Sequence, residues 1–457
     1  MIFSARKKNL NLTEGPLFSS MIAFAIPLII SNVFSALFHA VDMAVLARFA
    51  EGDAVAAVGS TTALTALFLN TSVGLGVGAT VILARCFGEG NKERAQTVLS
   101  TSILTGVFLG AALAVAGALT VPLGLRLMDC PAECLADATL YAVIYILGMP
   151  FYLVYSYAAA ALRVAGDSEH PMYYMMAGGV VNLVLNILFC LLLPKKVLAV
   201  AIATLASNLL GAFLTVRRLA TAEGVAHLDI KKMRFDLKTF GSMLKYGLPA
   251  AITQLLFPIS NLQVQTGINA HGAAAIAGST ACSQYESIVN FACGAFASTA
   301  ITFIGQNLGA KKPKRVFRTF FYTQAMETAV ALSIVLPVFF FGAQLIPIFS
   351  GDDPAAVAAG LVRIRYVLLC YPIAMNVFGS TIQAFGYPHL QTMINLAGVF
   401  GLRTVWMQFI YDKMIPATIE NLYLCFPVSL ILTHAVNAAV TAFLLLRYRK
   451  GKYKKKI

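Results

Sequence analysis

The stretch PLFSSMIAFAIPLIISNVFSALFHAVDMAVLA, residues 16–47, decides the fold class. Its apolar part from Leu17 to Ala47 exceeds the roughly 20 helical residues that cross the hydrocarbon core of a bilayer. Asp42 stands inside it, although a carboxylate in a membrane helix is costly unless it has water, a cation or a proton. The alternative is a snorkelling or hydrogen-bonded Asp42 near the outer interface. Because Pro27 in the same stretch favours a kink, the pair predicts a helix that moves in response to an ion.

The composition of the chain is that of a polytopic membrane protein. It has 457 residues, of which 59% are hydrophobic and only 12% are charged. The net charge of +14 raises the question of nucleic acid, but the basic residues gather in short loops and at the C-terminus. That distribution is typical of membrane orientation. We therefore expect a lipid bilayer and no nucleic acid as partner, a multi-pass protein of the cell's inner (plasma) membrane, and cytoplasmic termini.

Turn and charge signals separate the apolar segments into twelve predicted spans, with one longer charged connection in the middle. This connection divides the chain into halves of six spans. The prediction is an N-terminal lobe over residues 1–216, a cytoplasmic linker over 217–239, and a C-terminal lobe over 240–457 with a basic cytoplasmic tail.

Prolines repeat between the two halves. Pro27 and Pro249 are separated by the same number of residues as Pro150 and Pro372. Since six is even, the second half begins on the same side of the membrane as the first, which makes the repeat parallel. The predicted fold is all-α, with twelve transmembrane helices in two parallel, pseudo-symmetric six-helix lobes.

Polar residues inside the spans indicate an ion site in the first lobe. Asn182 and Asn186 are four residues apart and share one face of a helix. The next span offers the hydroxyl of Thr204 and, if that helix is irregular, the carbonyl of Val200. With Asp42 they form an all-oxygen set that suits a hard cation such as sodium, while the lone carboxylate could instead carry a proton. The alternative is that the asparagines and Thr204 only hold helices together.

At this point residues 14–447 resemble the MATE family (multidrug and toxic compound extrusion). The likeness rests on the parallel repeat, the Pro27-to-Asp42 spacing, the loops GEGN (88–91) and GAKK (309–312), and ALRVAGDSEHP (161–171). It implies a secondary active antiporter that exports bulky organic cations or drugs in exchange for sodium ions or protons. The family's first-lobe ion site matches Asp42, Asn182, Asn186 and Thr204, and its first-helix proline, implicated in bending, matches Pro27.

The second lobe is less acidic than in some branches of that family. Gln254 and Gln263 stand in the span where other members carry a Glu, and Asn376 is in the neighbourhood of an Asp seen elsewhere. Glu286 could supply negative charge to a substrate cleft or form an ordinary interhelical hydrogen bond. These four residues are the predicted substrate cleft. Arg403, unusual within a span, is expected to neutralise one of the intramembrane acids.

Two other functions are weighed against the antiporter. A lipid-linked oligosaccharide flippase, or another lipid flippase of the same superfamily, is expected to show more spans or a cationic cavity. A membrane-embedded enzyme needs clustered His, Asp or Cys, but the six histidines are scattered. We therefore expect no enzyme and no cofactor besides the coupling ion. We also expect a monomer, and no direct use of ATP because the pattern GxxxxGK[ST] is absent.

Overall fold

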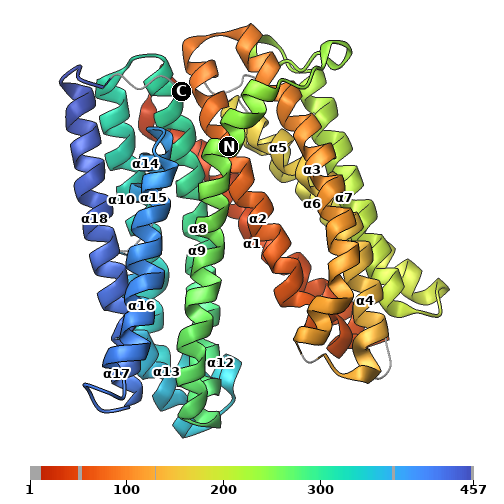
Figure 1. Ribbon diagram of the computed structural model, residues 1–457, viewed down its shortest axis with the longest axis vertical. Coiled ribbons are helices and arrows are strands. Elements are labelled where there is room, and N and C mark those ends of the chain that lie inside the picture. Colours follow the sequence, from red (N-terminus) through yellow and green to blue (C-terminus); the bar gives the residue numbers. More distant parts are fainter. Residues whose placement is uncertain (1–11, 50–53, 129, 373–375, 454–457) are drawn as a thin grey trace. The chain divides into compact units, whose positions relative to one another are not determined.

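The computed structural model describes residues 12–49, 54–128, 130–372 and 376–453, and every regular element in these ranges is helical (Figure 1). This confirms the predicted all-α class. The elements of the first half are α1 (Leu17–Phe49), α2 (Ala54–Glu89), α3 (Lys92–Leu127), α4 (Ala132–Leu147), α5 (Met149–Val164), α6 (Glu169–Leu192), α7 (Lys196–Ala220), η1 (Gly224–Ala226) and η2 (Ile230–Lys232).

The second half contains more short and broken helices than the first. Its elements are α8 (Leu237–Ala270), α9 (Ala273–Gly309), α10 (Pro313–Phe340), α11 (Gly342–Leu345), α12 (Pro347–Ser350), α13 (Pro354–Tyr366), η3 (Leu368–Cys370), α14 (Val377–Ala384), α15 (Pro388–Asn395), η4 (Leu396–Gly401), α16 (Leu402–Val405), η5 (Trp406–Ile410), α17 (Ile419–Tyr423) and α18 (Cys425–Arg449).

The helices have the length and hydropathy of membrane spans. Within the described residues, 9 helices are long and apolar enough to cross a bilayer, or up to 11 if each of two bent pairs forms one span. The helix α8 has 34 residues but is not among them, because Gln254, Asn261, Gln263 and Gln265 lower its hydropathy. Counting α8 brings the number to the predicted twelve, so the polytopic fold is confirmed.

Contacts between residues divide the chain into two compact units. Unit 1 comprises residues 1–15 and 26–251, and unit 2 comprises residues 16–25 and 252–457. The division crosses α1 between Ala25 and Ile26 and crosses α8 between Ala251 and Ile252. The lobe boundaries expected from the sequence, on either side of a 217–239 linker, stay a prediction.

In unit 1 small residues let helices approach closely. On α3, a side chain at Gly110 would lie 2.4 Å from the Cα atom of Pro150 on α5, and one at Gly106 would lie 3.0 Å from the backbone nitrogen of Val154. Such contacts between helix backbones are the usual means of packing where lipid removes the hydrophobic driving force. The apolar core of this unit includes Val45 of α1, so the half of α1 that carries Asp42 is anchored in unit 1.

In unit 2, α9 packs against α10, α13 and α14 (Figure 1). Its closest crossing is with α13, where a side chain at Gly278 would lie 2.1 Å from the carbonyl oxygen of Ala356 and 2.6 Å from the backbone nitrogen of Gly360. Only glycine fits there without a backbone shift. The crossing brings the next turn of α13 against the middle of α9, which positions the charged residues described below.

The predicted tenth span is broken between η3 and α14. The first backbone N–H groups of α14 therefore need an acceptor outside their own helix. The fully buried carboxylate of Glu327 on α10 accepts from the backbone N–H of Asn376 at 3.1 Å and from that of Val377 at 3.3 Å. Glu327 thus stabilises the start of a helix.

Candidate functional site

The side chains predicted for the ion site in the first lobe lie within hydrogen-bond distance of one another in unit 1. The Nδ2 atom of Asn186 donates to Oδ1 of Asp42 at 2.6 Å and to Oδ1 of Asn182 at 3.0 Å. Asn186 is fully buried, Asn182 is 5% exposed, and Asp42 is half-buried. The carboxylate of α1 is therefore held by the face of α6 on which the two asparagines lie.

The network continues from α6 to α7. The Nδ2 atom of Asn182 donates to the Thr204 hydroxyl at 3.4 Å, and that hydroxyl donates to the carbonyl of Val200 at 3.0 Å. Because α7 is a continuous α-helix there, the Val200 carbonyl is not freed by an irregular turn. It takes part through Thr204, its neighbour one turn on.

One oxygen in this network has no partner. The Oδ1 atom of Asn186 is buried, and no group in the described part of the chain donates a hydrogen bond to it. Rotating the amide by 180° would not help, because its NH2 group already donates to Asp42 and Asn182. A buried acceptor without a donor is costly. Together with the Asp42 carboxylate it forms a set of oxygens that fits a hard cation.

A glycine brings α1 close to this face of α6. An ideal side chain at Gly179 would lie 1.8 Å from the ring of Phe38, which is one turn before Asp42 on α1. Its neighbour Gly178 has only an ordinary contact, 3.5 Å from the Ser207 carbonyl oxygen. Gly179 is one turn before Asn182, so the missing side chain lets the Phe38 ring settle beside the site.

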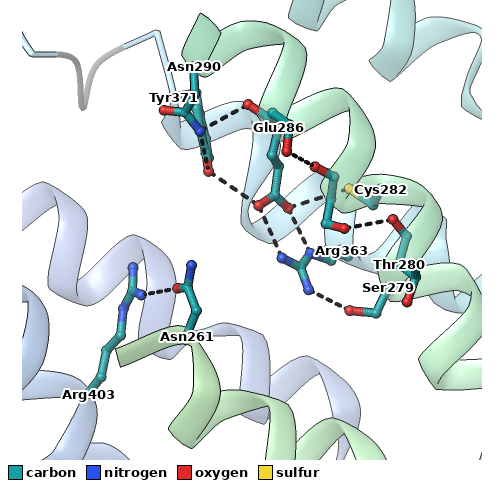
Figure 2. Close-up of polar contacts among 11 residues, drawn as sticks. Asn261, Ser279, Thr280, Cys282, Glu286, Asn290, Arg363, Tyr371 and Arg403 are labelled. Atoms are coloured by element: carbon teal, nitrogen blue, oxygen red, sulfur yellow. Dashed lines mark hydrogen bonds and ion pairs between the residues drawn. The ribbon is translucent and has the colours of Figure 1, made fainter. Parts of the chain in front are cut away.

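A second polar cluster, in unit 2, surrounds Glu286 (Figure 2). Arg363 of α13 binds this carboxylate in a bidentate pair, with Nε to Oε1 at 2.7 Å and Nη2 to Oε2 at 3.0 Å. Its Nη1 atom donates to the hydroxyl of Ser279, and the hydroxyl of Tyr371 donates to Glu286 Oε2 at 3.2 Å. Glu286 and Arg363 are 6% and 7% exposed, so they form a buried ion pair.

Arg403 was expected to neutralise an intramembrane acid, but the partner of Glu286 is Arg363. Arg403, 2% exposed, donates from Nη1 to Oδ1 of Asn261 at 2.7 Å and from Nε to the Ser429 hydroxyl at 3.1 Å. Its guanidinium lies 4.4 Å from the ring centroid of Phe426. No ion pair found within the described ranges includes Arg403, so its charge is met only by neutral groups.

Unit 2 contains a cavity of about 230 Å³ beside these charges. Asn261, Glu286 and Phe426 line it. Of the four residues predicted for a substrate cleft, Glu286 is the one that lines this cavity. The others lie elsewhere: Gln263 accepts from the Thr404 hydroxyl at 3.0 Å, and Gln254 and Asn376 are exposed. Their role stays a prediction.

The segment ALRVAGDSEHP contains a further ion pair at the turn between α5 and α6. The buried carboxylate of Asp167 accepts from Nη2 of Arg218 at 3.1 Å and from Nδ1 of His170 at 2.8 Å. Burial alone would raise the pKa of Asp167, but hydrogen bonds from His170 and the charges of His170 and Arg218 hold the pKa below its ordinary value. This turn therefore ties α6 to the end of α7 and is structural.

Comparison with known proteins places the chain in a family. A family model named MatE matches residues 27–188 and 249–407, which is more than half of the chain. The chain is 26% identical to "Probable multidrug resistance protein YoeA" of Bacillus subtilis, over 96% of this chain and 94% of that protein. It is 25% identical to "FAD transporter" of Shewanella oneidensis, over 75% of this chain and 77% of that protein.

A solved structure agrees with these relatives. The crystal structure of MATE in the bent conformation superposes with a TM-score of 0.88 at 18% identity, covering 98% of this chain and 100% of that one. At that identity it supports the fold alone. The match of the family model to both halves identifies the chain as a transporter, not an enzyme, that belongs to the MatE family.

Proposed function

We propose that this chain is a secondary active antiporter that exports drug-sized molecules, organic cations among them, in exchange for sodium ions or protons. The observation that carries the proposal is the bond between Asn186 and Asp42, beside a buried amide oxygen that no donor meets. A relative named as a probable multidrug resistance protein supports drug-sized cargo. Another is named an FAD transporter, so the relatives do not agree on one charge for the cargo.

The site can alternate between two states. An ion-free Asp42 carboxylate is stabilised mainly by the Asn186 amide, because a charged side chain within a membrane helix otherwise needs water or a counter-charge. A sodium ion would be held by this carboxylate and by Asn186 Oδ1, while a proton would remove the charge altogether. Such an ion drives the transporter only if it binds one conformation more tightly than the other.

Two prolines support bending of the helices that connect the units. The division between units crosses α1 directly before Ile26, next to Pro27, and it crosses α8 after Ala251, two residues beyond Pro249. A proline inside a helix removes one backbone hydrogen bond and weakens the helix locally. We propose Pro27 as the position at which α1 bends when the ion occupies Asp42.

The cellular setting belongs to the same proposal. The chain is a multi-pass membrane protein. The distribution of basic residues favours cytoplasmic termini in the plasma membrane, although the basic residues at 6–8 and 454–456 lie outside the described residues. We expect a monomer, because each unit contains its own buried core.

The test uses full-length protein reconstituted in liposomes and a fluorescent organic cation, ethidium. We expect a sodium gradient or a pH gradient to drive ethidium transport by the wild type, and Asp42→Asn to abolish the response. Asp352→Asn, which removes an exposed loop carboxylate, is the matched control and should transport like the wild type. Gradient-driven transport that Asp42→Asn leaves unchanged would overturn the assignment.

A further inference from the structure

Positive charge exceeds negative charge around the cavity of unit 2. Two buried guanidinium groups, those of Arg363 and Arg403, stand beside one buried carboxylate, that of Glu286. The nearby acid Glu327 is engaged elsewhere, at the start of α14. The bidentate pair with Arg363 uses up the charge of Glu286, and the charge of Arg403 is left over. A buried charge without a counter-charge is costly, so this surplus calls for an anion.

Asn261 connects that surplus charge to the cavity. Its Oδ1 atom accepts from Arg403, and its side chain lines the cavity and is exposed. Figure 2 shows that its Nδ2 atom points away from Arg403, towards the side on which Glu286 and Tyr371 lie. A hydrogen bond from a cation to the amide oxygen polarises the amide and makes its NH2 group a stronger donor. Asn261 therefore presents a strengthened donor with a positive charge directly behind it.

The other guanidinium has little left to offer a ligand. Arg363 directs Nε and Nη2 to Glu286 and Nη1 to Ser279. An incoming anion would have to break a buried bidentate pair to reach it, which is strongly unfavourable. The recognition of an anion thus falls to Asn261, with Arg403 supplying the charge.

We propose that this cavity binds the anionic group, a carboxylate, of a transported substrate, with Asn261 as the direct donor and Arg403 as the charge behind it. The inference rests on the proposed export of drug-sized molecules and specifies their chemistry. A cavity of about 230 Å³ takes only one end of such a molecule. The substrates it selects are amphoteric or acidic, and a molecule whose only charge is positive is disfavoured at this cavity.

The first measurement needs no variant. Purified full-length protein in uncharged detergent is titrated with rhodamine B, which has a free carboxylate, and with its ethyl ester, which has the same ring system without that charge. Binding is followed by fluorescence anisotropy without any ion gradient. A hydrogen bond to a charged group predicts that rhodamine B binds about tenfold more tightly than the ester. Equal affinity, or tighter binding of the ester, overturns the proposal.

The variant Asn261→Asp tests the mechanism. It preserves the shape of the side chain and gives Arg403 the carboxylate it lacks, so we expect the preference for rhodamine B to disappear and thermal stability to be kept or increased. The control Asn269→Asp adds the same charge at an exposed position of α8 and should retain the preference. If Asn261→Asp retains it as well, the proposal is wrong.

Arg403 is tested by a pair of substitutions. Arg403→Gln should lower the affinity for rhodamine B and leave that for the ester unchanged, and Arg403→Lys should restore most of the difference. A purely structural role for Arg403 predicts instead that both affinities fall together, and that result would contradict the proposal.

An anionic lipid headgroup shares the chemistry of a substrate carboxylate. The titration is therefore repeated in micelles with added phosphatidylglycerol. Lipid that removes the preference at low mole fraction assigns the cavity to a headgroup and overturns the proposal, whereas a preserved preference supports it. If the protein still transports ethidium along an ion gradient but shows no preference for the carboxylate, this inference fails and the proposed antiport stands.

Discussion

At the scale of the residue, one amide organises the candidate ion site. Asn186 donates from a single nitrogen to two acceptors, Asp42 and Asn182, and its oxygen remains without a donor. A buried amide whose NH2 group is saturated and whose oxygen is free differs from one that only joins helices, since it retains capacity for a ligand. This distinguishes the ion-site hypothesis from the alternative in which the asparagines hold helices together.

The substitution Asn186→Leu tests that distinction. It keeps a similar volume but removes both the donor to Asp42 and the free oxygen. Because a hydrogen bond to a charged group contributes about 1.5–3 kcal/mol, the apparent affinity for the coupling ion should fall by about tenfold or more. The measurement is the ion concentration that half-saturates transport. The variant Asn208→Leu, which removes a half-buried amide of α7 outside the network, should leave that concentration unchanged.

At the scale of the element, glycines set which helix faces meet. Gly179 accommodates the ring of Phe38, and Gly278 lies against the backbone of Gly360 at the crossing of α9 and α13. The first contact places α1 beside the ion site, and the second places Arg363 beside Glu286. The chemistry of both clusters thus depends on positions that carry no side chain.

Two neighbouring glycines provide a matched test of this point. Gly179→Ala puts a methyl group into the Phe38 ring, so we expect α1 to shift and the affinity for the coupling ion to fall several-fold. Gly178→Ala makes an ordinary contact and should leave the affinity unchanged. Thermal unfolding in detergent would report the packing defect independently. Equal behaviour of the two variants would contradict the role given to Gly179.

The elements also show how far the sequence could be interpreted. The spacing of Asn182 and Asn186 places them on one helix face regardless of tertiary structure, so their grouping could be predicted. The pairing of Arg363 with Glu286 could not, because it depends on a crossing between helices far apart in the sequence. Alternating polarity gives no hint that Arg363 is buried while Arg365 is exposed. The break before α14 was missed because its capping acid comes from another helix.

At the scale of the whole molecule, the two units share a repeat but not a chemistry. Gly59-Ser60 and Gly278-Ser279 match in the sequence, yet the Ser60 hydroxyl donates to the Ala57 carbonyl while Ser279 accepts from Arg363. Unit 1 presents a carboxylate and free oxygen, and unit 2 presents a surplus of positive charge. The repeat preserved the glycines and prolines that shape helices, and the charges diverged. We infer that coupling ion and substrate anion use separate units.

The most direct measurement of the central claim is ion binding to purified protein without substrate. Sodium is titrated calorimetrically at constant ionic strength, and proton uptake is followed with a pH dye in sodium-free buffer, for the wild type, Asp42→Asn and Asp352→Asn. We predict saturable binding of one of these ions by the wild type and by Asp352→Asn, and none by Asp42→Asn. Wild-type ion affinity in Asp42→Asn would contradict the claim that this carboxylate binds the coupling ion.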